Sequence, residues 1–333
     1  MRAAVERALR DGSQKAQREL RRLSVPLGER VEIFEIIERA GVWLMFQPLD
    51  NLYGFYRRLD GAAGIVIHAA HPLTLQRSTA AHEYGHHVLD HDASLDPAEY
   101  IEKPFDELPP EEAAAQSFAA NFLMPLQLVN RMLPRVGLGR QPTLVTPEQA
   151  YELSVLMGTS YQGTVTQLQS LHKIDWRQAR NLRKQHPIDI KSRLADGRRP
   201  ANARADVWRI NEIYDGEQIA VRVDDEIHVT LPEQPTAGAR WLAADVDGLQ
   251  LLDSWREQPT TSDTPTIYGQ RRVRHLWFRA TDPGHASVSL VLARPQNLAH
   301  VAKRFELALA IDERATGATE QGVSQPQKPQ LVA

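Results

Sequence analysis

The residues best suited to chemistry in this chain are two histidines four positions apart, His82 and His86, with Glu83 beside the first. On a helix, positions i and i+4 lie on one face, so both imidazole rings can direct a nitrogen to one point. Zinc accepts such nitrogens at about 2.0–2.1 Å. It lowers the pKa of its water to about 7, and Glu83 is then placed to accept the proton and return it to a leaving amine. The spacing predicts a metallopeptidase with zinc, or Mn2+ on the same ligands.

A catalytic zinc needs a third protein ligand and one open position. The helix predicted to run from Glu111 to Met124 begins with two acidic residues, Glu111 and Glu112, and its alanines allow close packing against the motif helix. Spacing alone does not choose between these two. Chance placement of 12 histidines in 333 residues rarely produces this motif, so a surface helix with scattered histidines is the weaker interpretation.

Other polar residues near the motif have lesser roles in this interpretation. His71, His87 and His91 are expected at the surface or behind the ligands. Asp90 or Asp92 is available to orient a ligand histidine, although an ordinary exposed acid is the simpler expectation.

The motif helix is expected to begin at Pro72, because proline suits the first turn of a helix. Three short strands are expected before it, at 42–46, 52–57 and 64–68. A helix is predicted at 28–40. Residues 1–25 are basic with helical periodicity and are predicted to form an exposed helix or a mobile leader.

A helical extension is predicted over 141–186, behind a peptidase domain at 26–140. Thr146-Pro147-Glu148 has the composition of a helix start, and two helices separated by 157–160 are typical of a helix-turn-helix. The net charge of residues 146–175 is near zero, so direct DNA binding is not expected. Residues 187–206 have little apolar content and are predicted to be a linker.

The periodicity changes to alternation after the linker. Apolar residues recur every second position at 219–223 and 227–231, and Asp224-Asp225 is expected to form a hairpin turn between them. Residues 207–296 therefore read as a β-sandwich. Residues 297–315 have helical spacing, and 316–333 are polar and predicted to be disordered.

The composition is that of an ordinary globular protein, with 42% hydrophobic residues, 24% charged residues and a formal net charge of -3. The absence of cysteine excludes disulfides, thiolate metal sites and a thiol nucleophile. Charges interrupt the first residues too often for a signal peptide, and no apolar run is long enough to span a bilayer. We expect a cytoplasmic protein that does not bind membranes.

Residues 26–130 resemble the ImmA/IrrE family of metallopeptidases. The resemblance is carried by Ser78–His87 and by Glu112–Pro125, which is similar to the family pattern E-x-x-A-N-x-F-A-x-x-L-M-P. The leading Glu of that pattern is the third metal ligand, so the resemblance implies Glu112. The family's Asn is Gln116 here, which we expect to affect helix packing more than chemistry. The family is similar to thermolysin-type zincins, and its members typically cleave a helix-turn-helix repressor in a stress or mobile-element programme.

Residues 226–296 resemble the chagasin family of cysteine-peptidase inhibitors. The resemblance is carried by Ile227–Trp241, similar to L-x-x-N-P-T-T-G-Y-x-W, and continues through Phe278–Ala280 to Ala293–Pro295. It implies an immunoglobulin-like sandwich whose loops enter the cleft of a papain-like peptidase. The loop residues that it singles out are Pro235, Thr236, Gly238, Gly269 and Arg294.

The sequence therefore predicts an α+β protein in which a zincin-like peptidase domain with a helical extension precedes an all-β sandwich. The leading hypothesis is a zinc endopeptidase that cleaves a regulatory protein, with the sandwich as a recognition or inhibitor module. A peptidase inhibitor with an auxiliary peptidase domain is the first alternative. The second is a DNA-binding transcriptional regulator, which the intact set of His82, Glu83, His86 and Glu112 argues against.

Overall fold

The computed structural model describes residues 2–59, 61–92, 108–195, 197–233, 238–257 and 272–313. The chain divides into two compact units, of which the first contains Met1–Lys184 and the second Gln185–Arg314. The expected α+β class with a C-terminal β-sandwich is confirmed. None of the described helices is long and apolar enough to cross a membrane.

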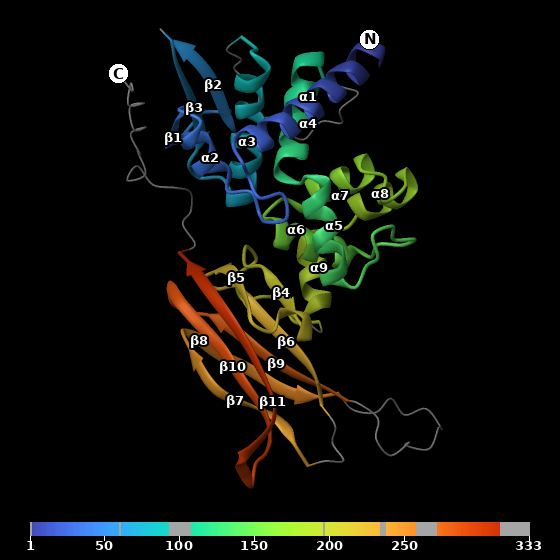
Figure 1. Cartoon of the computed structure of the whole chain (residues 1–333), viewed down its shortest axis with the longest axis vertical. Coiled ribbons are helices and arrows are strands. Elements are labelled where there is room, and N and C mark those ends of the chain that lie inside the picture. The colour runs from blue at the N-terminus through green and yellow to red at the C-terminus, as the bar shows by residue number, and fades with distance from the viewer. Residues whose placement is uncertain are drawn as a thin grey trace. The chain divides into compact units, whose positions relative to one another are not determined.

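The first unit is mainly helical with one small sheet (Figure 1). Its elements are α1 (Arg2–Arg22), α2 (Ile33–Arg39), β1 (Trp43–Gln47), β2 (Gly54–Leu59), β3 (Ala62–His68), α3 (Leu73–Leu89), α4 (Pro110–Leu123), α5 (Leu126–Met132), the 3-10 helix η2 (Leu133–Val136), α6 (Pro147–Met157), α7 (Tyr161–Ser170) and α8 (Trp176–Arg183). The sheet has the order β1-β3-β2, with β1 parallel and β2 antiparallel to β3. Residues 93–107 lie outside the described residues.

Helix α1 is part of the core of the first unit, so the prediction of a leader at residues 1–25 is wrong beyond its helical conformation. Val5, Ala16 and Leu20 are buried. Gly12 faces α4 so closely that a Cβ there would overlap the Ala114 carbonyl oxygen. The many charges of α1 lie on its other side and hid this packing from sequence analysis, because a helix needs only one apolar stripe to pack.

Replacing Gly12 with Ala is expected to lower the free energy of unfolding by about 2–3 kcal/mol, because the new methyl group forces α1 away from α4. Denaturant unfolding of the full chain measures this. Gly139→Ala is the matched control, since a Cβ at Gly139 meets nothing within 4 Å. Equal unfolding midpoints for the two variants would show that α1 does not pack as described.

The helical extension is tied to the peptidase part by Arg77, a side chain of α3 that is 1% exposed. Its Nε donates to the carbonyl oxygen of Gly158, in the turn between α6 and α7, at 3.0 Å. Another of its nitrogens donates to the Val31 carbonyl oxygen at 2.5 Å. Helix α6 begins at Pro147, at the helix start that the sequence predicts, and its N-cap residue Thr146 forms a capping box with Gln149. The buried arginine makes the extension a structural part of the first unit.

The second unit is a sandwich of two four-stranded sheets, with the orders β5-β11-β10-β7 and β4-β6-β9-β8. Its elements are α9 (Pro187–Leu194), β4 (Val207–Ile210), the 3-10 helix η3 (Glu212–Tyr214), β5 (Glu217–Arg222), β6 (Glu226–Glu233), β7 (Arg240–Asp247), β8 (Leu249–Arg256), β9 (Arg272–Ala280), β10 (Gly284–Arg294) and β11 (Asn297–Asp312). The alternating residues Ile227, Val229 and Leu231 are buried, as predicted.

Two expectations for the chain around the sandwich are wrong. Residues 187–194 form α9 rather than a linker, and the buried Lys191 donates to the Ala205 carbonyl oxygen at 2.6 Å, which anchors this polar segment without many apolar residues. Residues 297–312 form β11 rather than a helix. Its buried residues from Phe305 to Ile311 alternate with Glu306, Ala308 and Ala310, and the two alanines put apolar residues on both faces, which hides a period of two.

The hairpin expected at Asp224-Asp225 is also absent, because β5 and β6 belong to different sheets. Asp225 instead accepts hydrogen bonds from the backbone N–H groups of Asp206 and Arg222, at 2.8 and 3.0 Å. The Asp225 carboxylate thus stabilises the connection where the chain passes from β5 in one sheet to β6 in the other. The tail expected at 316–333 lies outside the described residues.

His228 of β6 is a buried histidine whose titration affects stability. Its ring lies 4.4 Å from the Trp277 ring centre, and its Nε2 lies 2.8 Å from Nδ1 of His275. Burial, followed by the positive charges of His275 and Arg209, lowers the pKa of His228 to about 3. The folded state therefore holds this imidazole neutral.

A buried neutral His228 makes the sandwich sensitive to acid. The contribution of neutral His228 to the free energy of unfolding is fully present above the unfolded pKa of about 6.5. It is lost as pH falls toward 3, and the loss is about 3 kcal/mol at pH 4. Thermal unfolding at pH 7 and pH 4 measures the loss, and His228→Phe should reduce it. An equal acid loss in both proteins would assign it to other groups.

Candidate active site

The site depends on a close crossing of α3 and α4 at Gly85 and Ala115. A Cβ at Gly85 would lie 3.1 Å from both the Ala115 carbonyl oxygen and the Phe118 ring, so glycine is what allows this approach. His82 lies three residues before Gly85, and Glu112 three residues before Ala115. One turn from the crossing, the two helices therefore bring these side chains together.

The side chains of His82, His86 and Glu112 meet at one buried point. The two Nε2 atoms lie 3.1 Å apart. Glu112 places Oε2 at 3.2 Å from Nε2 of His82 and Oε1 at 3.6 Å from Nε2 of His86. Glu111, the other candidate from spacing, is exposed. Tertiary structure thus favours Glu112.

Two neutral side chains orient the histidines from behind. Oε1 of Gln116 lies 3.1 Å from Nδ1 of His82, and Nδ1 of His91 lies 3.0 Å from Nδ1 of His86. An amide oxygen only accepts, so Nδ1 of His82 carries the proton and its Nε2 presents a lone pair. If His86 likewise donates from Nδ1 to His91, both Nε2 lone pairs face Glu112.

This donor set fits a divalent metal ion. Burial raises the pKa of Glu112, but the neighbouring imidazole rings of His82 and His86 lower it more, so the carboxylate is ionised. Three electron-pair donors at these separations repel one another unless a cation lies between them. Two nitrogens bound at about 2.0–2.1 Å to a tetrahedral ion would be ~3.3 Å apart, close to the spacing found here. Three protein ligands leave a fourth position open.

Comparison with known families agrees with this geometry. Residues 37–144 match the IrrE N-terminal-like domain, Peptidase_M78, and residues 220–310 match the chagasin family of peptidase inhibitors, I42. The chain joins an IrrE N-terminal-like domain to a chagasin-family domain. Both predicted resemblances are confirmed, and the family of the first domain is one of metallopeptidases.

Solved structures similar to this chain match its second part over their near-complete lengths. A cysteine protease inhibitor from Entamoeba histolytica, EhICP2, shares 14% identity over 32% of this chain and 97% of that chain, with a TM-score of 0.28. The solution structure of amebosin shares 22% identity over 32% and 98%, with a TM-score of 0.26. PbICP-C, solved in complex with falcipain-2, shares 11% identity over 32% and 92%, with a TM-score of 0.21. No curated protein matches the chain.

In the IrrE-like domain, the motif residue Tyr84 faces away from the candidate metal site. Its ring packs against Phe118 and Phe122, and its hydroxyl donates to Glu19 of α1. Burial raises the pKa of Glu19, but hydrogen bonds from Arg22 and Tyr84 lower it more, so Glu19 is ionised. Helix α1 therefore braces the motif helix from behind.

Glu83 lies beside His82 on α3 and is 1% exposed. As the residue next to His82 in the motif, Glu83 is the candidate to exchange protons with a group bound at the open position. Residues outside the donor set have other contacts. Asp90 pairs with Arg58 at 2.6 Å instead of orienting a ligand histidine, and Asp92 is exposed.

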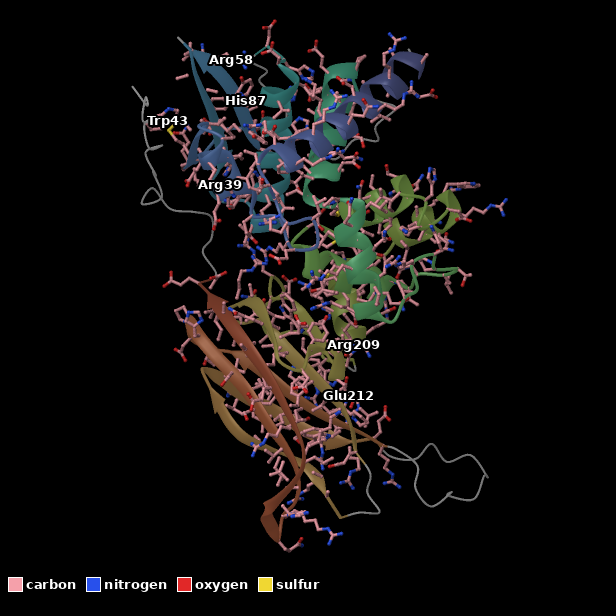
Figure 2. The ribbon with its side chains drawn as sticks, viewed as in Figure 1. Arg39, Trp43, Arg58, His87, Arg209 and Glu212 are labelled. Carbon is pink, nitrogen blue, oxygen red and sulfur yellow. The ribbon has the colours of Figure 1, made fainter. Side chains whose placement is uncertain are left out.

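His87 and His71 contact groups away from the candidate metal site. His87 lies 3.1 Å from the Tyr56 hydroxyl, near Arg58 (Figure 2). His71 packs on Tyr53 and His68. The orienting group for His86 is His91, one of the three histidines that the sequence placed at the surface or behind the ligands.

Gln116 is the residue whose role sequence reasoning missed. It was expected to affect helix packing, whereas its side chain contacts the candidate ligand His82 directly. Its position four residues after Glu112, on the same face of α4, was the available signal.

Replacing Gln116 with Leu is expected to weaken zinc binding about 10- to 100-fold, because His82 loses the acceptor that fixes its tautomer. Chelator competition measures the affinity. Gln116→Glu is the matched control, since it keeps an acceptor and should bind at least as tightly as the parent. Equal affinities of the Leu and Glu variants would contradict an orienting role.

Only two of the five loop residues predicted in the chagasin-like domain, Gly238 and Arg294, lie among the described residues. Pro235, Thr236 and Gly269 lie outside the described residues. Gly238 has a φ of +67°, a conformation that favours glycine, and Arg294 is exposed at the end of β10. The two described residues are therefore at turn and surface positions.

Proposed function

We propose that this chain is a zinc-dependent endopeptidase with His82, His86 and Glu112 as ligands and Glu83 as the proton-transfer group. The observation that carries the proposal is the convergence of two imidazole Nε2 atoms and one ionised carboxylate at a buried point. Membership of the first domain in a metallopeptidase family supports it.

The roles of the protein groups follow from their positions. A zinc ion held by these ligands would supply a water of lowered pKa and polarise a substrate carbonyl. Glu83 would accept a proton at the open position and return it to the departing amine nitrogen. Gln116 and His91 keep the histidine rings turned toward the site throughout.

The substrate we propose is a transcriptional repressor of a stress or mobile-element programme, and the location we propose is the cytoplasm. The family resemblance supports the substrate class, and the absence of cysteine is compatible with a reducing compartment. In the producing cell, replacing the protein with its Glu83→Gln variant should make the substrate accumulate uncut. Comparing all cellular proteins in the two strains tests this, and no intact protein accumulating would count against the substrate class.

A second candidate function is inhibition of a papain-like cysteine peptidase by the chagasin-like domain. The match to the chagasin family over 220–310 favours it, and PbICP-C is a protein solved in complex with falcipain-2. Residues 185–314 form the compact unit that contains α9 and all of β11. Papain assays with this fragment and with the full Glu83→Gln chain test the function, and unaltered papain activity with both would reject it for papain.

A further inference from the structure

A groove of about 630 Å³ lies in the first unit between α1, α4, α5 and α7, elements that Figure 1 shows next to one another. This volume is in the range of pockets that hold ligands, about 300–1,000 Å³. One wall is a stripe along α1 formed by Arg10, Gln14, Gln17 and Arg21. The spacing of these residues places them on one face of the helix.

The facing wall is rigid and rich in amides. Asn121 donates to the Ser117 carbonyl oxygen at 2.9 Å, and Gln167 donates to the Met124 carbonyl oxygen at 3.0 Å. Leu126, 44% exposed, gives this wall an apolar edge. Polar groups held in place in this way need little reordering when a ligand binds.

The groove is separate from the candidate metal site. Ser117 and Asn121 line it, whereas Glu112 and Gln116 of the same helix face α3. These pairs lie on different faces of α4, since each residue turns the helix by about 100°.

The groove is positively charged, although the chain as a whole has a formal net charge of -3. The only charged residues that line it are Arg10 and Arg21, and neither forms an ion pair with a carboxylate in the described part of the chain. Eleven residues separate them, which on a helix is about 16 Å. An extended peptide spans that length in about five residues.

We propose that this groove binds an extended, acidic peptide segment of a partner protein. Acidic side chains of the segment pair with Arg10 and Arg21, and the amides of Gln14 and Gln17 satisfy its backbone. The lining contains no aromatic side chain, which disfavours single-stranded nucleic acid because stacking contributes much of that binding. The proposal is independent of peptidase activity, so it can be tested where cleavage is abolished.

Fluorescence polarisation with the full-length Glu83→Gln chain tests the proposal. The probe is a fluorescein-labelled peptide GEALSEG, whose two acidic residues lie on one side of an extended chain. The amide peptide GQALSQG should bind about tenfold more weakly, and raised salt should weaken the acidic probe. Failure of the acidic probe to bind, or equal binding of both peptides, overturns the proposal.

Charge reversal locates the binding. Arg10→Glu and Arg21→Glu should each weaken the acidic probe about fivefold or more, whereas Arg18→Glu, an exposed arginine of α1 outside the groove, should change it less than about twofold. Circular dichroism confirms that the variants fold. An effect of Arg18→Glu as large as that of Arg10→Glu would indicate long-range electrostatic attraction to α1 rather than binding in the groove. Displacement of the probe by oligothymidylate at lower concentration than by unlabelled GEALSEG would assign the groove to nucleic acid.

Discussion

Replacing Glu83 with Gln is expected to reduce peptide cleavage by at least about 10³-fold while leaving zinc content unchanged. The amide has nearly the volume of the carboxylate, so the buried position beside His82 remains filled. An amide cannot accept the proton that the attacking water must lose, and general acid–base catalysis alone contributes about 10²–10⁴-fold. The loss should fall on kcat rather than KM, because a proton transfer is removed and not a binding contact.

Two measurements on one preparation decide this prediction. Elemental analysis should give the same zinc content for both proteins, and a cleavage assay on the accumulated substrate should show the loss. Glu111→Gln is the matched control, since this glutamate is exposed and lies one residue before the candidate ligand Glu112. Normal cleavage by the Glu83 variant, or absence of zinc from the parent protein, would reject the proposed mechanism.

Replacing Glu112 with Ala is expected to remove zinc and activity together. Its carboxylate oxygens lie 3.2 and 3.6 Å from the two histidine nitrogens, so its loss leaves a two-ligand site. Catalytic zinc sites use three protein ligands, and we expect the zinc affinity to fall more than about 100-fold. Chelator competition measures that fall without reference to activity.

The same variant has a structural signature. The two Nε2 lone pairs of His82 and His86 lose the carboxylate that faces them, but the helix crossing at Gly85 remains. Unfolding of the metal-free protein should therefore change much less than zinc affinity does. Glu111→Ala provides the comparison, and an equal loss of zinc in both variants would show that spacing and resemblance chose the wrong ligand.

The helix α1 and the helical extension give the candidate site a supporting framework on two sides. Glu19 holds Tyr84, and Arg77 ties α3 to the turn at Gly158. Both anchors are buried ionic side chains whose removal leaves partners unsatisfied. The first unit therefore depends on segments that lie outside 37–144, the range matched by the IrrE N-terminal-like domain.

The sequence by itself indicated two candidate metal ligands and a candidate proton-transfer group. The spacing of His82 and His86 required a shared helix face, and the alternation at 227–231 required a strand. The structure contains the helix and the strand that these spacings predict, because each spacing is set by backbone geometry within one element. The resemblances extended them to two domains, which the family matches confirm.

Only the tertiary structure decided which side chains meet. It placed Glu112 rather than Glu111 beside the two histidines, because the crossing at Gly85 turns one face of α4 toward α3. The structure also shows that α1 packs in the core and that β11 is a strand. In the sequence, the charged face of α1 and the alanine-containing face of β11 obscured the periodicity of their buried residues. Sequence spacing reports which residues share a face of one element, whereas a contact between elements depends on the shapes of both packed surfaces.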